Sequence, residues 1–149
     1  MTVVERKGAA RDAWTEYTVH RLEDRDHIRA LLGTRRPYAA YALGQLDPAL
    51  YRQTEWWQAS NGGHEALVLH SRGGLGHATF TMGEVGALEA LLRVHPGGRH
   101  TFLTCEPHHL DTVLRHFDLE QRQTMIRMLV SRDSFRPVDG PVRRLAGMD

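Results

Sequence analysis

The sequence has few of the features that mark secreted, membrane-spanning or strongly charged proteins. Its 149 residues include one cysteine, Cys105, so an internal disulfide is excluded and a reducing compartment is expected. No apolar run approaches the ~20 residues that a membrane helix needs. Residues 1–7 contain no apolar core of a signal peptide. The sequence therefore predicts a cytoplasmic protein with no membrane partner.

An excess of charge of one sign is also missing. The chain has 19 basic and 18 acidic residues and a net charge of +1, so no general attraction to nucleic acid is expected. The arginine pairs at 35–36 and 143–144 are interpreted as solvated surface. A hydrophobic fraction of 41% over 149 residues is ordinary for a folded protein, and it predicts one globular domain rather than a disordered chain.

Hydrophobic periodicity predicts an α/β fold with a mixed central sheet and helices on its faces. The expected order is β-α-α-(β)-β-β-α-β-α-β. Strands are predicted over 17–22, 77–82, 101–105 and 123–130, and a short apolar run predicts a buried strand over 65–70. Residues 51–57 fit either a short strand or a turn of helix. Three-to-four spacing predicts helices over 24–33, 37–46, 84–94 and 107–117. We expect a flexible tail over 1–16, a domain over 17–136 and a linker-like tail over 137–149.

A β-hairpin over residues 65–82 is predicted to run directly into the helix that follows Gly83. The glycine-rich stretch 72–78 lies between the two strands of this hairpin. Because no helix N-terminus stands behind it, we interpret this stretch as a turn rather than as a phosphate-binding loop.

The order of the elements and three strings resemble the GNAT-type N-acetyltransferase superfamily. The strings cover residues 36–43, 51–57 and 124–130. They are most similar to the N-terminal half of longer bacterial proteins in which two GNAT-like units stand in tandem. The likeness spans roughly residues 19–145, and residues 141–145 resemble the lead into a second unit. The resemblance implies a GNAT-like fold and, as partner, a second GNAT-like unit or another copy of the chain.

In GNAT enzymes, backbone N–H groups at the start of a helix hold the pyrophosphate of acetyl-CoA, within a pattern of Gln or Arg, two residues, Gly, one residue, and Gly or Ala. The matching positions here are Gly83, Glu84, Val85 and Gly86. Neither register of the glycines reproduces the pattern, and Glu84 adds negative charge where the diphosphate would lie. We therefore expect that ordinary acetyl-CoA binding is lost and that no cofactor is used. The predicted function is a non-catalytic GNAT-like domain with a structural, regulatory or ligand-sensing role.

The alternative is an active acetyl-CoA-dependent N-acetyltransferase on an unidentified amine. That reaction needs a general base for the amine proton and an acid for the leaving thiolate. Glu65, Glu84 or a tyrosine could serve, and nothing in the sequence selects among them.

Aromatic residues are densest between residues 38 and 57. Tyr41, Tyr51, Trp56 and Trp57, together with Tyr38, could line a pocket for an acceptor substrate or form a partner surface. Packing in the core is the other interpretation of the same residues.

Cys105, His108 and His109 form the tightest group of metal-ligand types in the sequence. No second Cys/His pair completes a recognised zinc pattern, so we expect surface histidines and no metal. Cys105 lies on an apolar strand before a helix start. It is interpreted as a core residue, with a reactive thiol as the alternative because a helix N-terminus lowers thiol pKa values.

Overall fold

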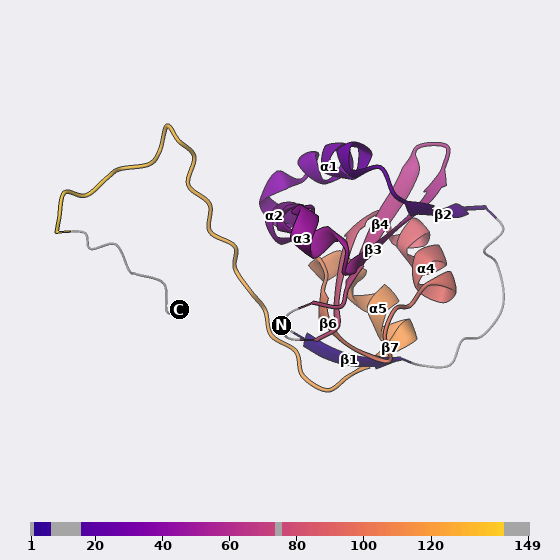
Figure 1. Ribbon diagram of the computed structural model, residues 1–149. Helices are drawn as coiled ribbons and strands as arrows, with labels where there is room; N and C mark the ends of the chain where they lie inside the picture. Colours follow the sequence, from indigo (N-terminus) through magenta and orange to yellow (C-terminus); the bar gives the residue numbers. More distant parts are fainter. Residues whose placement is uncertain (1, 7–15, 74–75, 142–149) are drawn as a thin grey trace.

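The computed structural model describes residues 2–6, 16–73 and 76–141, and these form an α/β fold around one mixed sheet (Figure 1). The strands lie in the order β2-β3-β4-β5-β6-β1-β7. Neighbouring strands are antiparallel except β5 and β6, which are parallel. The strands are β1 (Thr2–Arg6), β2 (Thr18–Leu22), β3 (Thr54–Asn61), β4 (His64–Ser71), β5 (Ala78–Gly83), β6 (His100–Thr104) and β7 (Phe117–Leu119).

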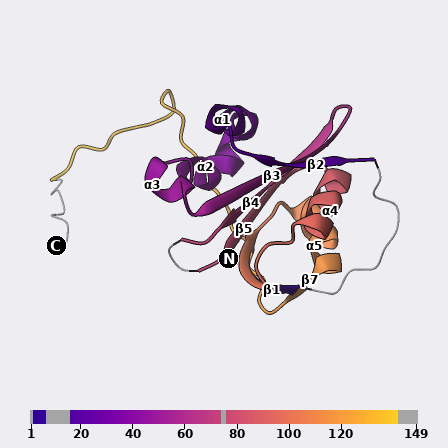
Figure 2. The ribbon, with the colours of Figure 1, turned by 45° about the vertical axis from the view of Figure 1, so that its right-hand side comes forward.

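Helices cover both faces of the sheet, as the sequence predicts. The helices are α1 (Arg25–Gly33), α2 (Arg36–Gly44), α3 (Pro48–Tyr51), α4 (Val85–Val94), the 3₁₀ turn η1 (Pro107–His109) and α5 (Leu110–His116). Figure 2 shows α1, α2 and α3 on one side of the sheet and α4 and α5 on the other. Within the described ranges, no helix is both long and apolar enough to cross a membrane.

The central strand β4 connects the two halves of the core. Leu67 and Leu69 point into the cluster under α1 and α2, whereas Ala66 and Val68 point into the cluster under α4 and α5. Because β4 is covered on both faces, its sequence is an almost continuous apolar run instead of an alternating one.

The predicted hairpin is confirmed, and the ambiguous segment before it is resolved. Strands β4 and β5 pair antiparallel, with Leu67 opposite Met82 and Leu69 opposite Phe80. Residues 48–51 form the short helix α3, and the chain then enters β3 at Thr54. The segment 51–57 therefore contains the end of a helix and the start of a strand.

The predicted strand over 123–130 is wrong. After β7 these residues form neither helix nor strand, and the side chains of Ile126 and Met128 are 87% and 92% exposed. Their alternation favours an extended chain, but alternation alone provides no strand edge to pair with. The position beside β6 is taken by β1, and β7 pairs with the other edge of β1.

The expected tail over 1–16 includes residues that the structure places in the sheet. Thr2–Arg6 form β1, which pairs with both β6 and β7. Phe117 also differs from expectation, because it begins β7 instead of ending the last helix. In both cases long-range strand pairing decides a conformation that short-range periodicity does not reveal.

Candidate functional site

An opening in the sheet lies between the carboxyl ends of the parallel strands β5 and β6. The two strands pair from Ala78–Phe102 to Phe80–Thr104, and β5 then continues to Gly83 without a partner on β6. Helix α4 begins directly after this opening. Crevices at the carboxyl ends of strands are where open α/β sheets bind ligands, and residues 83–86, which the sequence predicts as the counterpart of a cofactor loop, lie at the same place.

Side chains of the protein itself occupy the opening. His109 Nδ1 lies 3.0 Å from the Thr81 hydroxyl and Nε2 lies 2.9 Å from the Gly83 carbonyl oxygen. Since a carbonyl only accepts, Nε2 carries a proton, and in the neutral ring Nδ1 then accepts from the Thr81 hydroxyl. The Tyr38 hydroxyl donates to the Thr81 carbonyl at 2.8 Å. The backbone oxygens that β6 does not reach are therefore satisfied internally.

His109 is fully buried, and burial lowers its pKa below the usual range for histidine. The ring is therefore neutral at pH 7, with its proton on Nε2 facing the Gly83 carbonyl. The neutral His109 ring forms hydrogen bonds through both of its nitrogens. It therefore links η1 to β5 and has a structural role.

The N-terminus of α4 is also closed by the chain itself. The Glu84 carboxylate accepts hydrogen bonds from the backbone N–H groups of Gly86 and Ala87, both at 2.9 Å, and from the Tyr17 hydroxyl at 3.1 Å. Burial acts to raise the pKa of Glu84, but these donors outweigh it and the pKa lies below its usual range. The N–H groups that an external anion would use are thus already bound to an ionised carboxylate.

Close packing explains Gly83, the first glycine of the predicted loop. Gly83 has φ +116°, and a Cβ atom there would lie 2.4 Å from the Glu65 carbonyl oxygen. A Cβ atom on Gly86 would lie 2.7 Å from the Tyr17 hydroxyl. The structure therefore places Gly83, Glu84, Val85 and Gly86 together at the β5–α4 junction, where the positive φ and the close approach of β4 require a glycine at position 83.

The sheet separates Trp57 from the other three aromatic residues that were expected in one pocket. Trp56 is buried in the cluster under α1 and α2, and the Tyr51 hydroxyl donates to the Glu23 carbonyl. Trp57 lies on the opposite face, stacked on His95 with ring centroids 3.3 Å apart. Tyr41 is half exposed and lines a cavity of about 620 Å³ beside α2.

The group of possible metal ligands near residue 105 differs in one member from the group that the sequence suggests. Ligand atoms of Glu106, His108 and His109 lie within 4.8 Å of one another, and Cys105 is not part of that group. Metal binding would require His109 to give up one of its two hydrogen bonds, and Glu106 already pairs with Arg35. Burial raises the pKa of the Cys105 thiol, so the thiol is neutral and the geometry favours a packing role.

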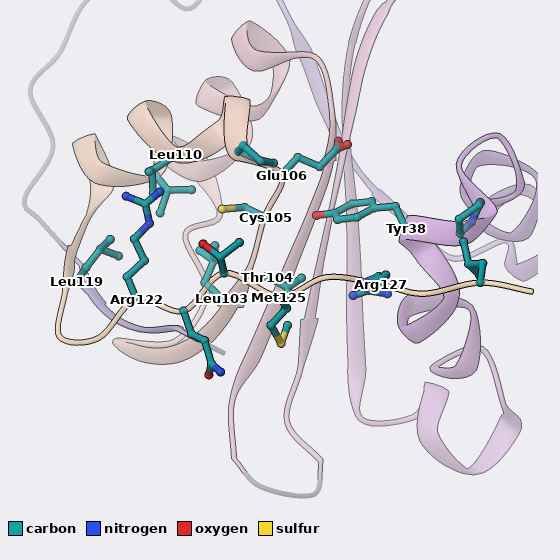
Figure 3. Close-up of a pocket in the computed structure, with 16 residues that line it drawn as sticks. Tyr38, Leu103, Thr104, Cys105, Glu106, Leu110, Leu119, Arg122, Met125 and Arg127 are labelled. Atoms are coloured by element: carbon teal, nitrogen blue, oxygen red, sulfur yellow. The ribbon is translucent and has the colours of Figure 1, made fainter.

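A cavity of about 410 Å³ lies next to the opening, between α2, the end of β6, α5 and the segment 122–129 (Figure 3). Tyr38, Cys105 and Glu106 form part of its wall, and Arg122 and Arg127 approach it from the segment after β7. Sequence reasoning missed Glu106 and both arginines. The sequence marks Glu106 only as a polar residue soon after an apolar strand, and it gives no such signal for the two arginines. The cavity wall is hard to predict because it is assembled from segments far apart in the chain.

Comparison with known proteins identifies no relative: no family model, curated protein or solved structure matches the chain.

Proposed function

We propose that this chain is a GNAT-like domain that does not transfer acetyl groups. Its role would be structural, regulatory or ligand-sensing, beside a second GNAT-like unit or another copy of itself. The observation that carries the proposal is the Glu84 carboxylate bound to the Gly86 and Ala87 N–H groups. The balanced charge and the single cysteine support a cytoplasmic location without a nucleic-acid or membrane partner.

A pyrophosphate at this helix start would have to displace Glu84 or lie beside its negative charge. Hydrogen bonds to a charged group contribute about 1.5–3 kcal/mol each, so displacing a carboxylate that accepts two of them is unfavourable. His109 and Tyr38 add a second obstacle, because they occupy the polar backbone groups of the neighbouring opening.

The residues considered as acid or base for an active enzyme have structural partners. Glu65 accepts a hydrogen bond from the Gln58 side-chain amide at 2.7 Å, and Glu84 caps α4. The Tyr38 hydroxyl donates to the Thr81 carbonyl, and burial raises the pKa of this hydroxyl. These contacts support the non-catalytic interpretation over the acetyltransferase alternative.

Isothermal titration of the full chain with acetyl-CoA tests the proposal, and no heat of binding is expected up to millimolar ligand. Micromolar binding, or thiol release from acetyl-CoA with any member of an amine panel, would overturn it.

The variant Glu84→Ser tests the physical reason. Serine keeps an N-cap but removes the charge, so this variant should gain weak, millimolar binding of inorganic pyrophosphate. Glu120→Ser removes an exposed carboxylate elsewhere and should gain none. If the two variants behave alike, Glu84 is not what blocks the site.

A further inference from the structure

A second cavity, of about 620 Å³, lies beside α2 and α3. Its wall includes residues of these two helices, of strands β4, β5 and β6, and of the segment 125–127. Figure 2 shows the two helices on the same side of the sheet. The volume lies within the range of small-molecule sites. Glu84 and His109, which close the β5–β6 opening, are not part of this wall, so the cavity is separate from the closed opening.

Apolar side chains with exposed surface line this cavity from several elements. Tyr41 of α2 is 50% exposed, Leu50 of α3 is 41% exposed, and Met125 and Ile126 of the segment after β7 are 53% and 87% exposed. Phe102 of β6 is half-buried and also lines the cavity. A hydrocarbon ligand would remove this apolar surface from water, which is favourable. The cavity therefore suits a ligand with an apolar body.

The charge of the cavity wall has one sign. Among the described residues that line the cavity, Arg127 is the only charged one. Its guanidinium group lies 5.5 Å from the centre of the Tyr38 ring, and across residues 16–73 and 76–141 it forms no ion pair with a carboxylate. A cation without a counter-ion, in a wall without acidic side chains, favours a ligand with a single negative charge.

A carboxylate matches this cation better than other charged groups do. A guanidinium group binds a carboxylate through two parallel hydrogen bonds, and the two charges are equal and opposite. A phosphate group carries additional negative charge, for which this wall has no second cation, since Arg122 lines the 410 Å³ cavity and not this one. An ammonium group would meet a charge of its own sign.

We propose that the 620 Å³ cavity binds a fatty acid of medium chain length, such as octanoate. The carboxylate pairs with Arg127, and the hydrocarbon chain packs against Tyr41, Leu50 and Phe102. Neither Glu106 nor Arg122 takes part. The inference rests on the proposed function, because it names the class of ligand that a ligand-sensing domain would bind.

Titration calorimetry of the full chain with octanoate tests this ligand class. Octanoate should bind with a Kd of about a millimolar or lower. Hexanoate, which is two methylene groups shorter, should bind about tenfold more weakly. Octanol and octylamine keep the chain but lack the carboxylate, and each should bind at least about tenfold more weakly. Absence of octanoate binding up to about 10 mM, or equal binding of octylamine, overturns the proposal.

A charge reversal at Arg127 tests the contact with the carboxylate. The Arg127 side chain is exposed, so Arg127→Glu should leave the fold intact. This variant should bind octanoate at least about tenfold more weakly than the parent chain and octylamine more tightly. Arg132→Glu, on the same segment but outside the cavity wall, should change neither. Unchanged octanoate binding in Arg127→Glu, or an equal change in both variants, overturns the proposal.

A matched pair of leucines tests where the hydrocarbon chain lies. Leu50 and Leu114 both lie on helices and are 41% and 38% exposed, but only Leu50 lines the cavity. Leu50→Glu places a negative charge in the wall and should weaken octanoate binding by at least about tenfold. Leu114→Glu should not change it. Equal binding by the two variants would place the ligand elsewhere and overturn the proposal.

Acetyl-CoA is titrated into the same preparation to separate this inference from the proposed function. A chain that binds neither ligand overturns only the fatty-acid site. A chain that binds acetyl-CoA in the micromolar range overturns the proposed function itself, whatever octanoate does.

Discussion

The two sides of the β5–β6 opening differ in how their polar groups are satisfied. On the α4 side, the Glu84 carboxylate and the His109 ring each form hydrogen bonds with groups of the protein itself. On the side toward residues 122–129, one buried oxygen of Glu106 has no donor among residues 2–6, 16–73 and 76–141. The polar groups named on the first side therefore have partners within the protein, whereas one oxygen on the second side has none among the described residues.

The difference follows from where the partners come from. Glu84 binds N–H groups two and three residues further along the chain, so this cap forms as soon as α4 forms. The cavity wall combines α2, the end of β6, α5 and the segment after β7, and such an assembly is set only by the whole fold. A helix cap made by neighbouring residues and a cavity made by distant segments can therefore lie next to each other at the β5–β6 opening.

Among the substitutions on the α4 side of the opening, Gly83→Ala should reduce the stability of the fold most. Gly83→Ala places a Cβ atom 2.4 Å from the Glu65 carbonyl oxygen at φ +116°, and we expect a loss of about 3–4 kcal/mol in the free energy of unfolding. Urea denaturation measures it. Gly44→Ala, at a helical position with open space around it, is the matched control and should be neutral or stabilising by about 0.5 kcal/mol. Equal stability of the two variants would contradict the crowding at β4.

Removing the His109 bridge should have the next largest effect. His109→Leu keeps the volume but leaves the Thr81 hydroxyl and the Gly83 carbonyl without their partner, which should cost about 3 kcal/mol. The control is His108→Leu, because the neighbouring His108 side chain is 49% exposed and should tolerate the change within about 0.5 kcal/mol. A thermal denaturation series gives both values, and a tolerant His109 would mean that the bridge does not stabilise the opening.

Mild acid should destabilise the fold through its buried histidines. Burial lowers the pKa values of His70 and His109 in the folded chain, whereas in the unfolded chain they titrate near about 6.5. The unfolded state therefore binds more protons below that pH, and stability falls as the pH drops through this window. Each ring that stays neutral should account for about 1 kcal/mol between pH 7 and 5.5.

Urea midpoints at several pH values measure this slope, and His109→Leu serves as its internal control. The variant should show a shallower pH dependence than the parent chain. A parent midpoint that stays constant between pH 7 and 5.5 would be evidence against neutral, buried rings.

Removing the Glu84 cap should have the smallest effect on stability. Glu84→Ala should cost about 1 kcal/mol, the usual cost of losing an N-cap. Glu120→Ala, an exposed carboxylate outside any helix, should change the unfolding free energy by less than about 0.5 kcal/mol. An unchanged urea midpoint for Glu84→Ala would mean that the carboxylate does not hold the α4 N-terminus, and the comparison between the two sides would lose its basis.

Most of the helices and the hairpin could be predicted because their causes are local. The residue before α1, Asp24, caps its first N–H groups, and Ile28 and Leu32 fall on one buried face. The position of Gly83 and Glu84 at a strand–helix junction could be predicted in the same way. The strand predicted over 123–130 is wrong, although its apolar residues do alternate. A strand also needs the edge of another strand to pair with, and β1 and β7 occupy the edge beyond β6.

Short-range order in the sequence thus decides the α/β class, the β4–β5 hairpin, the start of α4 and the carboxylate that closes it. Tertiary packing decides that β1 takes the place beside β6, that Trp56 and Trp57 lie on opposite faces, and that His109 fills the opening. It also brings Tyr38 next to Glu106 across 68 positions of the chain. Neighbouring residues determine the hydrogen bonds within one helical turn, so these can be predicted from the sequence. Contacts between distant segments form only when the sheet brings those segments together.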